Sequence, residues 1–404
     1  MIPTHESPLA APFVPQALPG DVNDVWDWWR NQMPVTKHWA YFDHAAVGPL
    51  SGPAATVVRN FAIEAAEHGD TPWLSWSQRV HSLRDTTAKL LNCDRDEVAL
   101  IPNTTTGINV IAEGFPWNEG DNLVSPEGEF PSNLFPWQNQ AHRGVSMRLV
   151  PRRDGRVEVN DLMAQVDDRT RIIALSWVGY ASGFRIDLPR LVAAAHAEGV
   201  LVMLDAIQGL GMYPLDWQTC PVDFLAADGH KWLLSPEGAG VAVIRREHIP
   251  TLRATDVGWA SVKNSHDYQH PKLELKDEAA RFESGSANMV GLMALAASME
   301  LFVAVRQRFG PDCISKRVCD LAAYAHNALK RAGATALFGP FETDHASGIV
   351  TFEVAGMSPA TFRKRALDHG IVVSCRGGGV RASIHAYNNE TDIDQLAQLV
   401  VDCK

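Results

Sequence analysis

The sequence lacks the features that mark secreted and membrane-spanning chains. Its N-terminus has no cationic segment followed by an apolar one, as a secretory signal would have. No apolar run approaches the length needed to cross a membrane. We therefore expect a cytoplasmic protein without a membrane partner.

Cysteine is sparse and irregularly spaced. The six cysteines form neither a CxxC pair nor a zinc-finger spacing, so we expect no metal site. In a chain of 404 residues we interpret them as free thiols in a reducing compartment. They are Cys93, Cys220, Cys313, Cys319, Cys375 and Cys403.

Positive charge is also in short supply, because 36 lysines and arginines face 47 aspartates and glutamates. The net charge of −11 argues against a general binder of nucleic acid or of anionic membranes, but it is compatible with a local basic pocket. The composition, 46% hydrophobic and 21% charged, is typical of a globular protein. The length fits one large and one small domain, or two similar ones.

What the middle of the chain contains is a regular alternation of short apolar runs and amphipathic segments. Such alternation predicts an α/β fold with a mostly parallel sheet covered by helices on both faces. We expect helices between these strands, including one near 133–142. The predicted strands lie at 97–101, 121–125, 145–150, 171–176, 200–204, 222–227 and 241–245.

The character of the chain changes near residue 290, where two long helices at 289–309 and 313–332 precede mixed strands and helices. We interpret this part as a smaller α+β domain. The first 20 residues hold five prolines and predict an extended arm, followed by a short helix within 21–33. The predicted units are the N-terminal arm and helix (1–40), the large α/β domain (41–290) and the small C-terminal domain (291–404).

Residues 200–231 carry the strongest chemical signal. Asp205 ends one apolar strand, and Lys231 follows the end of the next. Ligands of parallel sheets bind beyond the carboxyl ends of the strands, so these two side chains are expected near one site. Pyridoxal phosphate (PLP) needs a lysine for an imine and a carboxylate opposite its ring nitrogen. The alternatives are a helix N-cap for Asp205 and an exposed surface lysine for Lys231.

Three further segments could complete such a site. Residues 103–107 open a helix with hydroxyls and free backbone N–H groups, which suits a phosphate but also fits a plain N-cap. Phe130 could stack on a ring or belong to the core. Arg381 could bind a substrate carboxylate or lie on the surface, and Arg376 is a second candidate nearby.

Together these residues resemble the class V aminotransferase family, the cysteine desulfurase-like branch of the fold-type I PLP enzymes. The resemblance covers residues 41–388, and the order and spacing of its motifs make it specific. Segments 129–133, 176–180, 257–259 and 385–388 are similar to the isopenicillin N epimerase-like subgroup. The strongest motifs are DAIQ at 205–208, DGHKW at 228–232 and RFESGSAN at 281–288.

The resemblance implies a role for each matching residue. Lys231 would form the imine with PLP, Asp205 would pair with the pyridine nitrogen, and Gln208 would reach the 3′-oxygen side. Phe130 takes the place of a stacking histidine. Ser286 would reach the phosphate of the neighbouring subunit, which implies a homodimer with shared active sites. The phosphate contacts would come from Thr104, Thr105 and His230, and the substrate contacts from Arg381, His44, Ala45 and Ala46.

Three departures from the family pattern bear on function. Asp228 occupies a position that is often a phosphate-binding serine, so we expect it to turn toward backbone N–H groups or a cation. Tyr180 replaces an asparagine near the 3′-oxygen. Desulfurases carry a nucleophilic cysteine on a loop well upstream of the carboxylate-binding arginine. Here Cys375 lies only six residues before Arg381, so we do not expect persulfide chemistry.

The function predicted from these observations is chemistry at the α-carbon of an amino-acid substrate. We expect aminotransferase-type chemistry first. The alternatives are a PLP-dependent β-elimination lyase without the usual cysteine loop, or an amino-acid epimerase. A more distant alternative is a PLP-fold binding protein without catalysis, against which the intact set of cofactor residues argues.

Overall fold

The computed structural model describes residues 17–403, so most of the predicted N-terminal arm lies outside the described residues. A seven-stranded sheet forms the centre of the large unit, in the order β2-β8-β7-β6-β5-β3-β4. Only β8 runs antiparallel to its neighbours within this sheet, so the predicted mostly parallel α/β fold is confirmed. The strands are β2 (Val98–Ile101), β3 (Asn122–Pro126), β4 (Ser146–Val150), β5 (Thr170–Ser176), β6 (Leu201–Asp205), β7 (Phe224–Asp228) and β8 (Gly240–Ile244).

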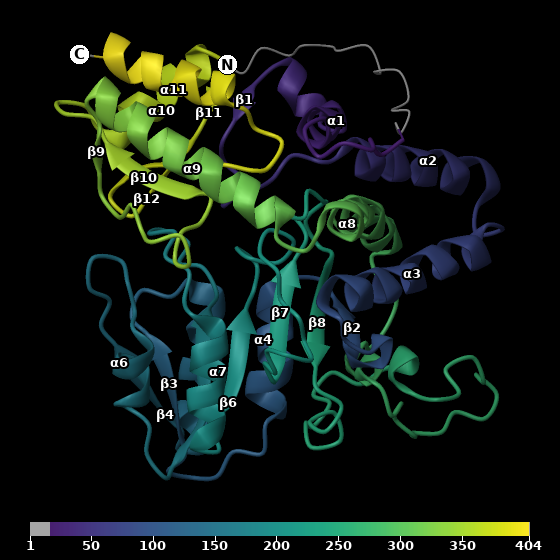
Figure 1. Cartoon of the computed structure of the whole chain (residues 1–404). Coiled ribbons are helices and arrows are strands. Elements are labelled where there is room, and N and C mark those ends of the chain that lie inside the picture. Colours follow the sequence, from purple (N-terminus) through teal and green to yellow (C-terminus); the bar gives the residue numbers. More distant parts are fainter. Residues whose placement is uncertain (1–16, 404) are drawn as a thin grey trace.

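Helices cover both faces of this sheet (Figure 1). Successive strand residues alternate between two hydrophobic clusters, one of which contains α4 (Thr104–Gly114) and the other α7 (Leu188–Ala197). Because both faces of the sheet are buried, most residues of each central strand are apolar, and the strands appear in the sequence as continuous apolar runs. Helix α4 lies very close to β7, because a Cβ atom at Gly107 would stand 2.7 Å from that of Ala226.

The C-terminal part adds a four-stranded antiparallel sheet with the order β12-β13-β10-β9. Its strands are β9 (Thr335–Ala336), β10 (Ile349–Glu353), β12 (Ser374–Arg376) and β13 (Gly379–Ser383). Helices α9 (Cys313–Ala332), α10 (Pro359–Asp368) and α11 (Glu390–Asp402) pack with it. The smaller α+β unit expected at the end of the chain is therefore present.

The N-terminal segment returns to this smaller unit. Strand β1 (Ala40–Tyr41) pairs in parallel with β11 (Ile371–Val372). Phe42 is buried in the hydrophobic cluster that the helices and strands of the smaller unit form. The next residues run from there toward the carboxyl edge of the large sheet, since the backbone N–H of Gly48 donates to the carbonyl of His230. The segment 40–48 thus connects the small unit with the end of β7.

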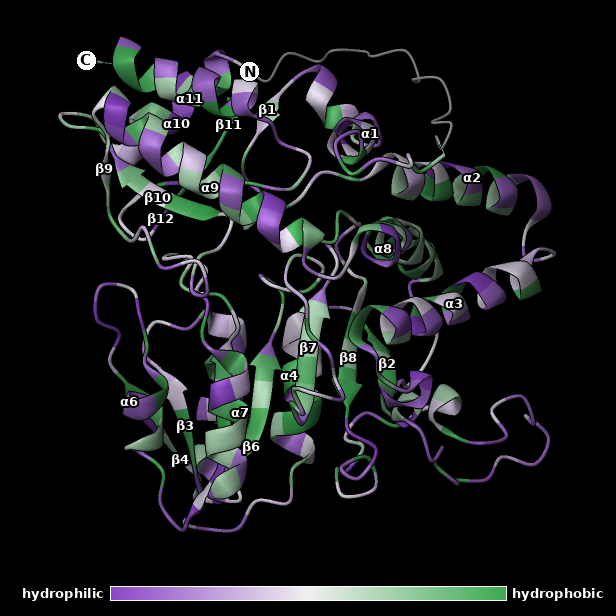
Figure 2. Ribbon diagram, viewed as in Figure 1, coloured by the Kyte–Doolittle hydropathy of each residue, from purple (hydrophilic) through white to green (hydrophobic). Residues whose placement is uncertain are grey.

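Helix α8 (Met289–Phe309) belongs to the core of the large unit, where it packs against α2 (Gly52–His68) and α3 (Trp73–Leu91). By length and composition alone α8 could cross a membrane, so the expectation that no apolar run reaches this length was wrong. In the structure 67% of its most apolar window is buried inside the protein. In Figure 2 these helices carry green, hydrophobic segments that alternate with purple, hydrophilic ones.

The helix predicted near 133–142 is the clearest local error. The structure has three short pieces there: η3 (Pro131–Asn133), α5 (Phe135–Gln138) and η4 (Asn139–Arg143). Pro131 and Pro136 each lie in the first turn of a short helix, where the missing N–H of proline has no helical partner to lose. In the interior of one longer helix, Pro136 would remove a backbone hydrogen bond and clash with the preceding turn. The remaining helices are α1 (Val25–Asn31), α6 (Val159–Met163), η1 (Pro34–Lys37), η2 (Arg95–Glu97), η5 (Trp259–Ser261) and η6 (Ala279–Phe282).

Candidate active site

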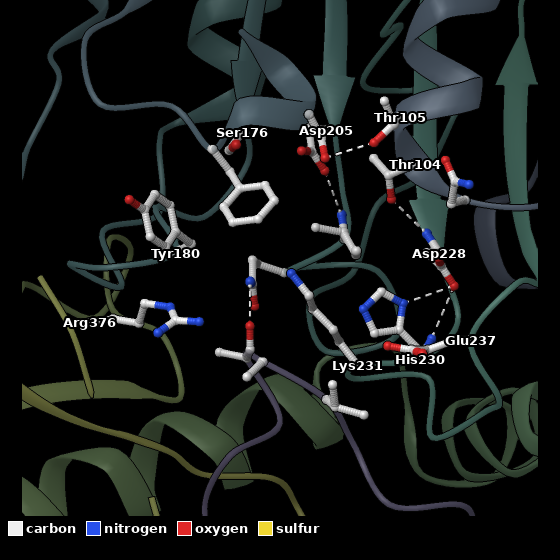
Figure 3. Close-up of a pocket in the computed structure, with 18 of the residues that line it drawn as sticks. Thr104, Thr105, Ser176, Tyr180, Asp205, Asp228, His230, Lys231, Glu237 and Arg376 are labelled. Carbon is white, nitrogen blue, oxygen red and sulfur yellow. Dashed lines mark hydrogen bonds and ion pairs between the residues drawn. The ribbon is translucent and has the colours of Figure 1, made fainter. Parts of the chain in front are cut away.

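The carboxyl ends of the parallel strands surround a cavity of about 260 Å³ (Figure 3). This is the edge of an α/β sheet at which ligands bind. Most of the residues that the sequence nominated line this one cavity, although they come from positions 45 to 381. They are Ala45, Ala46, Thr104, Thr105, Phe130, Tyr180, Asp205, Gln208, Asp228, His230, Lys231, Arg376 and Arg381.

Asp205 is a buried carboxylate at the end of β6. One of its oxygens accepts the backbone N–H of Ile207 at 3.1 Å, and the segment that follows is a turn rather than a helix. The N-cap alternative therefore does not hold. The pKa of Asp205 is raised to about 7, mainly by burial and also by the nearby carboxylate of Glu129, while the N–H of Ile207 and the charge of Lys231 act in the opposite direction. A carboxyl group in this state is suited to pair with a ligand N–H that carries positive charge.

Lys231 is buried too, which removes the surface-lysine alternative. Burial lowers its pKa to about 8, an effect that Asp205 opposes and Arg381 reinforces. Its Nζ atom lies 5.5 Å from the centre of the Phe130 ring. A lysine in this environment has a substantial neutral fraction near pH 8 and can attack a carbonyl.

Gly48 lets the N-terminal segment lie directly against the backbone of Lys231. Its N–H donates to the carbonyl of His230 at 2.6 Å, and a Cβ atom added to Gly48 would stand 2.0 Å from the carbonyl oxygen of Lys231. Because both contacts involve backbone, no side chain can move aside to make room. The position of Lys231 therefore depends on a glycine 183 residues earlier in the chain.

Replacing Gly48 with alanine is expected to lower the free energy of unfolding by about 1–3 kcal/mol, since the added methyl overpacks a rigid contact. Denaturant unfolding monitored by fluorescence measures this loss. Gly20→Ala is a matched control, because its added methyl would meet its nearest neighbour at 3.7 Å, an ordinary contact. Equal stability of the two variants would contradict the close contact at Gly48.

The N-terminus of α4 forms the candidate anion site. Asn103 caps this helix by accepting the N–H of Thr106 at 2.9 Å, and the first-turn N–H groups of a helix have no partners within it. The hydroxyl of Thr104 accepts the backbone N–H of Asp228 at 2.9 Å. The hydroxyl of Thr105 donates to Ser132 at 2.7 Å. The helix start and the end of β7 are thereby joined at one wall of the cavity.

Asp228 lines the cavity, and its carboxylate contacts His230. Its Oδ1 accepts the N–H of His230 at 3.3 Å and lies 3.0 Å from the Nδ1 atom of the same residue. This geometry agrees with the expectation that the carboxylate turns toward backbone N–H groups or a cation.

Trp232 fixes the orientation of the Gln208 amide. The indole N–H, which can only donate, lies 2.6 Å from Oε1 of Gln208. The Nε2 group must then point the other way, where one of its hydrogens donates to the carbonyl of Ala45 at 3.0 Å. The second Nε2 hydrogen stays available to a ligand oxygen in the cavity that Gln208 lines.

Arg381 lies on the side of the cavity formed by the small unit and is only 1% exposed. Its Nη1 donates to the carbonyl of Tyr180 at 2.8 Å, and its Nε donates to Ser374 at 3.2 Å. Its Nη2 lies 3.6 Å from Asp43 but makes no hydrogen bond within the described residues. Burial lowers the pKa of Arg381 to about 10. A buried guanidinium with a free donor is suited to a carboxylate.

Two nominated residues lie elsewhere. His44 does not line the cavity, which corrects the expectation that it would face the substrate. Its ring nitrogens bond Ser383 and Tyr387 at 2.7 Å each, which holds the ring in an aromatic cluster with Trp232. Ser286 is exposed and outside the cavity of its own chain. No cysteine among residues 17–403 lines the cavity either.

Several cavity residues were not predicted from the sequence. Ser176 ends β5 and donates its hydroxyl to Glu129, which is buried and also paired with Arg152 at 2.7 Å. Ser132 and Glu237 complete the wall near the helix start. Ser176 could have been predicted from its position at the end of a strand, which is the same feature that pointed to Asp205. The acceptor role of Glu129 could be known only from the fold.

Comparison with known proteins supplies the family context. Residues 40–396 match the family model described as Aminotransferase class-V. A probable cysteine desulfurase of Methanothermobacter thermautotrophicus is 27% identical over 391 residues, which cover 91% of this chain and 96% of that protein. Of 266 curated proteins that match, this is one of several named cysteine desulfurase.

Solved structures share the fold. The apo cysteine desulfurase of Thermococcus onnurineus NA1 superposes with a TM-score of 0.84 at 23% identity, covering 93% of this chain and 97% of that one. The cystine C–S lyase C-DES, in complex with its product cysteine persulfide, has a TM-score of 0.84 at 22% identity and covers 92% of this chain and 99% of that one. At these identities the likeness establishes the fold alone.

Proposed function

The chain belongs to the class-V aminotransferase family of PLP-dependent enzymes, and we propose that it breaks the bond between the β-carbon of an amino acid and its β-substituent. The names of the relatives support bond cleavage of this kind, because a desulfurase and a C–S lyase both act on a carbon–sulfur bond. They favour the lyase alternative over the aminotransferase-type chemistry that the sequence analysis placed first.

The residues of the cavity fit PLP. The observation that carries this fit is a buried carboxyl with a raised pKa and a buried lysine with a lowered pKa on one cavity wall. Lys231 would hold the aldehyde carbon, Asp205 the ring nitrogen, and Gln208 the 3′-oxygen. The start of α4 with Thr104 would hold the phosphate. When bound, PLP accepts the electron pair that is left on the α-carbon as the proton departs.

The residues of the chain would divide the remaining work. The Nζ of Lys231 would take the α-proton of the substrate, for which a pKa of about 8 is well matched. The free Nη2 of Arg381 holds the α-carboxylate and so fixes which bond faces Lys231. Phe130 covers the cavity beside Nζ and limits access of water.

We propose that the departing group leaves the enzyme without transfer to a protein thiol. Cys375 lies on β12 outside the cavity, and burial raises the pKa of its thiol. The turn after β12 consists of Gly377 and Gly378 alone before β13 begins, so the chain has no long loop there to carry a nucleophile. A thiol would have to be a thiolate to attack, which the raised pKa disfavours.

A product assay tests the proposed reaction. The holoenzyme is incubated with L-cystine or β-chloro-L-alanine in the absence of any 2-oxo acid acceptor. The proposal predicts equal amounts of pyruvate and ammonia. Product that appears only when a 2-oxo acid is added would instead establish transamination, and exchange of the α-hydrogen without pyruvate would point to epimerisation. Either outcome would overturn the lyase proposal.

We also propose a homodimer in which Ser286 completes the neighbouring site. Ser286 is exposed and cannot contact the cavity of its own chain, while the family resemblance gives this position a phosphate contact across subunits. Light scattering gives the mass in solution, for which the dimer predicts twice 44.3 kDa. A monomeric holoenzyme with full PLP occupancy would contradict this arrangement.

The uptake of PLP by the apoprotein is expected to depend on pH. Only the neutral amine reacts with the aldehyde, so below a pKa of about 8 each unit of pH lost reduces the reactive fraction of Lys231 about tenfold. The rate at which visible absorbance develops should therefore rise with pH and level off above about 8. A rate that keeps rising to the ordinary lysine pKa near 10.5 would contradict the buried position of Lys231.

A further inference from the structure

Arg376 is a second arginine on the cavity wall, and it has no role in the reaction proposed above. It is the last residue of β12, and it lines the cavity together with Arg381 and Tyr180. In Figure 3 its guanidinium points toward the space beside Tyr180 and Lys231, on the opposite side of Lys231 from Thr104 and Asp228. With the phosphate at the start of α4, as proposed above, this side of the cavity is left for the substrate.

The backbone holds Arg376 in a defined place. Strands β12 and β13 pair through Arg376 and Gly379, and the two-residue turn between them has positive φ at both Gly377 and Gly378. Glycines favour this tight turn, because other residues rarely adopt two successive positive φ values. A Cβ atom at Gly377 would stand 3.2 Å from that of Ala181, so the hairpin tip rests on the residue after Tyr180. Arg376 is therefore held at the cavity entrance.

The charge of Arg376 has no partner in the part of the chain that the structure describes. Its Nη1 donates to the carbonyl of its neighbour Cys375 at 2.8 Å, but no ion pair joins it to a carboxylate. Asp43, the carboxylate nearest this side, lies 3.6 Å from Arg381 instead. Arg376 also lies close enough to Lys231 and Arg381 to lower the pKa of both. Arg376 and Arg381 are thus neighbouring cations, and the charge of Arg376 has no carboxylate partner among the described residues, which favours an anionic ligand.

The α-carboxylate of the substrate accounts for one of these cations only. Arg381 is buried, fixed through Tyr180 and Ser374, and keeps one free donor, so it is the better site for the group common to all amino acids. Arg376 is more exposed and lies nearer the entrance, where the side chain of the substrate would extend. A second anion on that side chain would meet Arg376.

We propose that Arg376 recognises a negative charge on the β-substituent, so that the enzyme acts on amino acids whose departing group carries a carboxylate or a similar anion. This inference rests on the proposed lyase function. In the reaction on a thioether, the Cβ–S bond breaks and the sulfur keeps the electron pair and takes a proton. The three-carbon remainder reacts with water to give pyruvate and ammonia, so atoms and charge balance.

A matched pair of ligands isolates this charge. S-carboxymethyl-L-cysteine and S-carbamoylmethyl-L-cysteine differ only by a carboxylate in place of an amide. Titration of the holoenzyme with each, followed by the change in cofactor absorbance, gives a Kd without relying on turnover. The wild type should bind the carboxymethyl compound at least about tenfold more tightly, the range expected for a charged hydrogen bond at a partly exposed site. Added salt should reduce this preference.

Arg376→Gln should bring the two affinities within about twofold by weakening the anionic ligand. Arg331→Gln, at an exposed position in the last turn of α9, removes one positive charge away from the cavity and should keep the preference. The proposal is overturned if the wild type binds both ligands equally, or if Arg376→Gln weakens both to the same extent. Pyruvate formed from both ligands would then show that the lyase function stands alone. If neither ligand changes the spectrum or yields pyruvate, both proposals fail.

Discussion

Lys231→Ala is expected to reduce turnover by about 10³-fold or more, because it removes both the imine-forming amine and the base that takes the α-proton. The apoprotein should fold normally, since the amine is buried at a cost and its removal relieves that cost. Steady-state assays of pyruvate release measure the loss. The same variant should bind PLP without the visible absorbance of the wild-type holoenzyme.

Two controls separate this effect from misfolding. Lys263→Ala removes an exposed lysine that pairs with Asp277 at 2.8 Å and should leave turnover unchanged. Ethylamine added to Lys231→Ala supplies a small amine to the vacated space and should restore part of the activity. A Lys231→Ala variant that keeps a tenth of the wild-type rate would rule out the assigned role.

Asp205→Asn is expected to lower turnover by about 10²–10³-fold, the range observed when a preorganised electrostatic partner of the reacting group is removed. A neutral amide cannot balance a protonated ring nitrogen, so less of the electron pair on the α-carbon would be stabilised. The substitution keeps the shape of the side chain and its contact with the N–H of Ile207. The loss should appear in kcat more than in KM.

The stability of the apoprotein should change in the opposite direction. Burial raises the pKa of Asp205, so the folded state binds its proton more tightly than the unfolded state does. This group therefore stabilises the fold less as pH rises from about 4 toward about 7. At pH 8 the Asp205→Asn apoprotein should be more stable than the wild type by at least about 1 kcal/mol. A variant that is both slower and less stable would indicate a structural role instead.

Local patterns in the sequence were sufficient to predict the large sheet. Each strand is a short apolar run bounded by turn residues; Asp205 ends one of these strands, and Lys231 lies three residues after the end of the next. Because parallel strands end at one edge, their proximity in the cavity follows from topology alone. The broken helix after Pro131 was not predicted, since the expected helical segment was given more weight than the two prolines that interrupt it.

Contacts between distant segments could not be predicted in this way. The approach of Gly48 to Lys231 depends on how the N-terminal segment crosses the sheet edge. The bond from Trp232 to Gln208 depends on how the segments after β6 and β7 pack together. His44 was misplaced for the same reason, because its motif position does not show which way the ring turns. Arg376 was named only as an alternative to Arg381, and the hairpin that separates their positions became clear only in the structure.

The central claim is that Lys231 holds PLP in this cavity, and its chemical attachment can be measured directly. The holoenzyme is reduced with borohydride, digested, and its peptides are weighed by mass spectrometry. The account predicts that the stable cofactor adduct lies on the peptide containing Lys231 and that Lys231→Ala yields none. An adduct on a different lysine, or a wild-type protein that takes up no PLP, would contradict it.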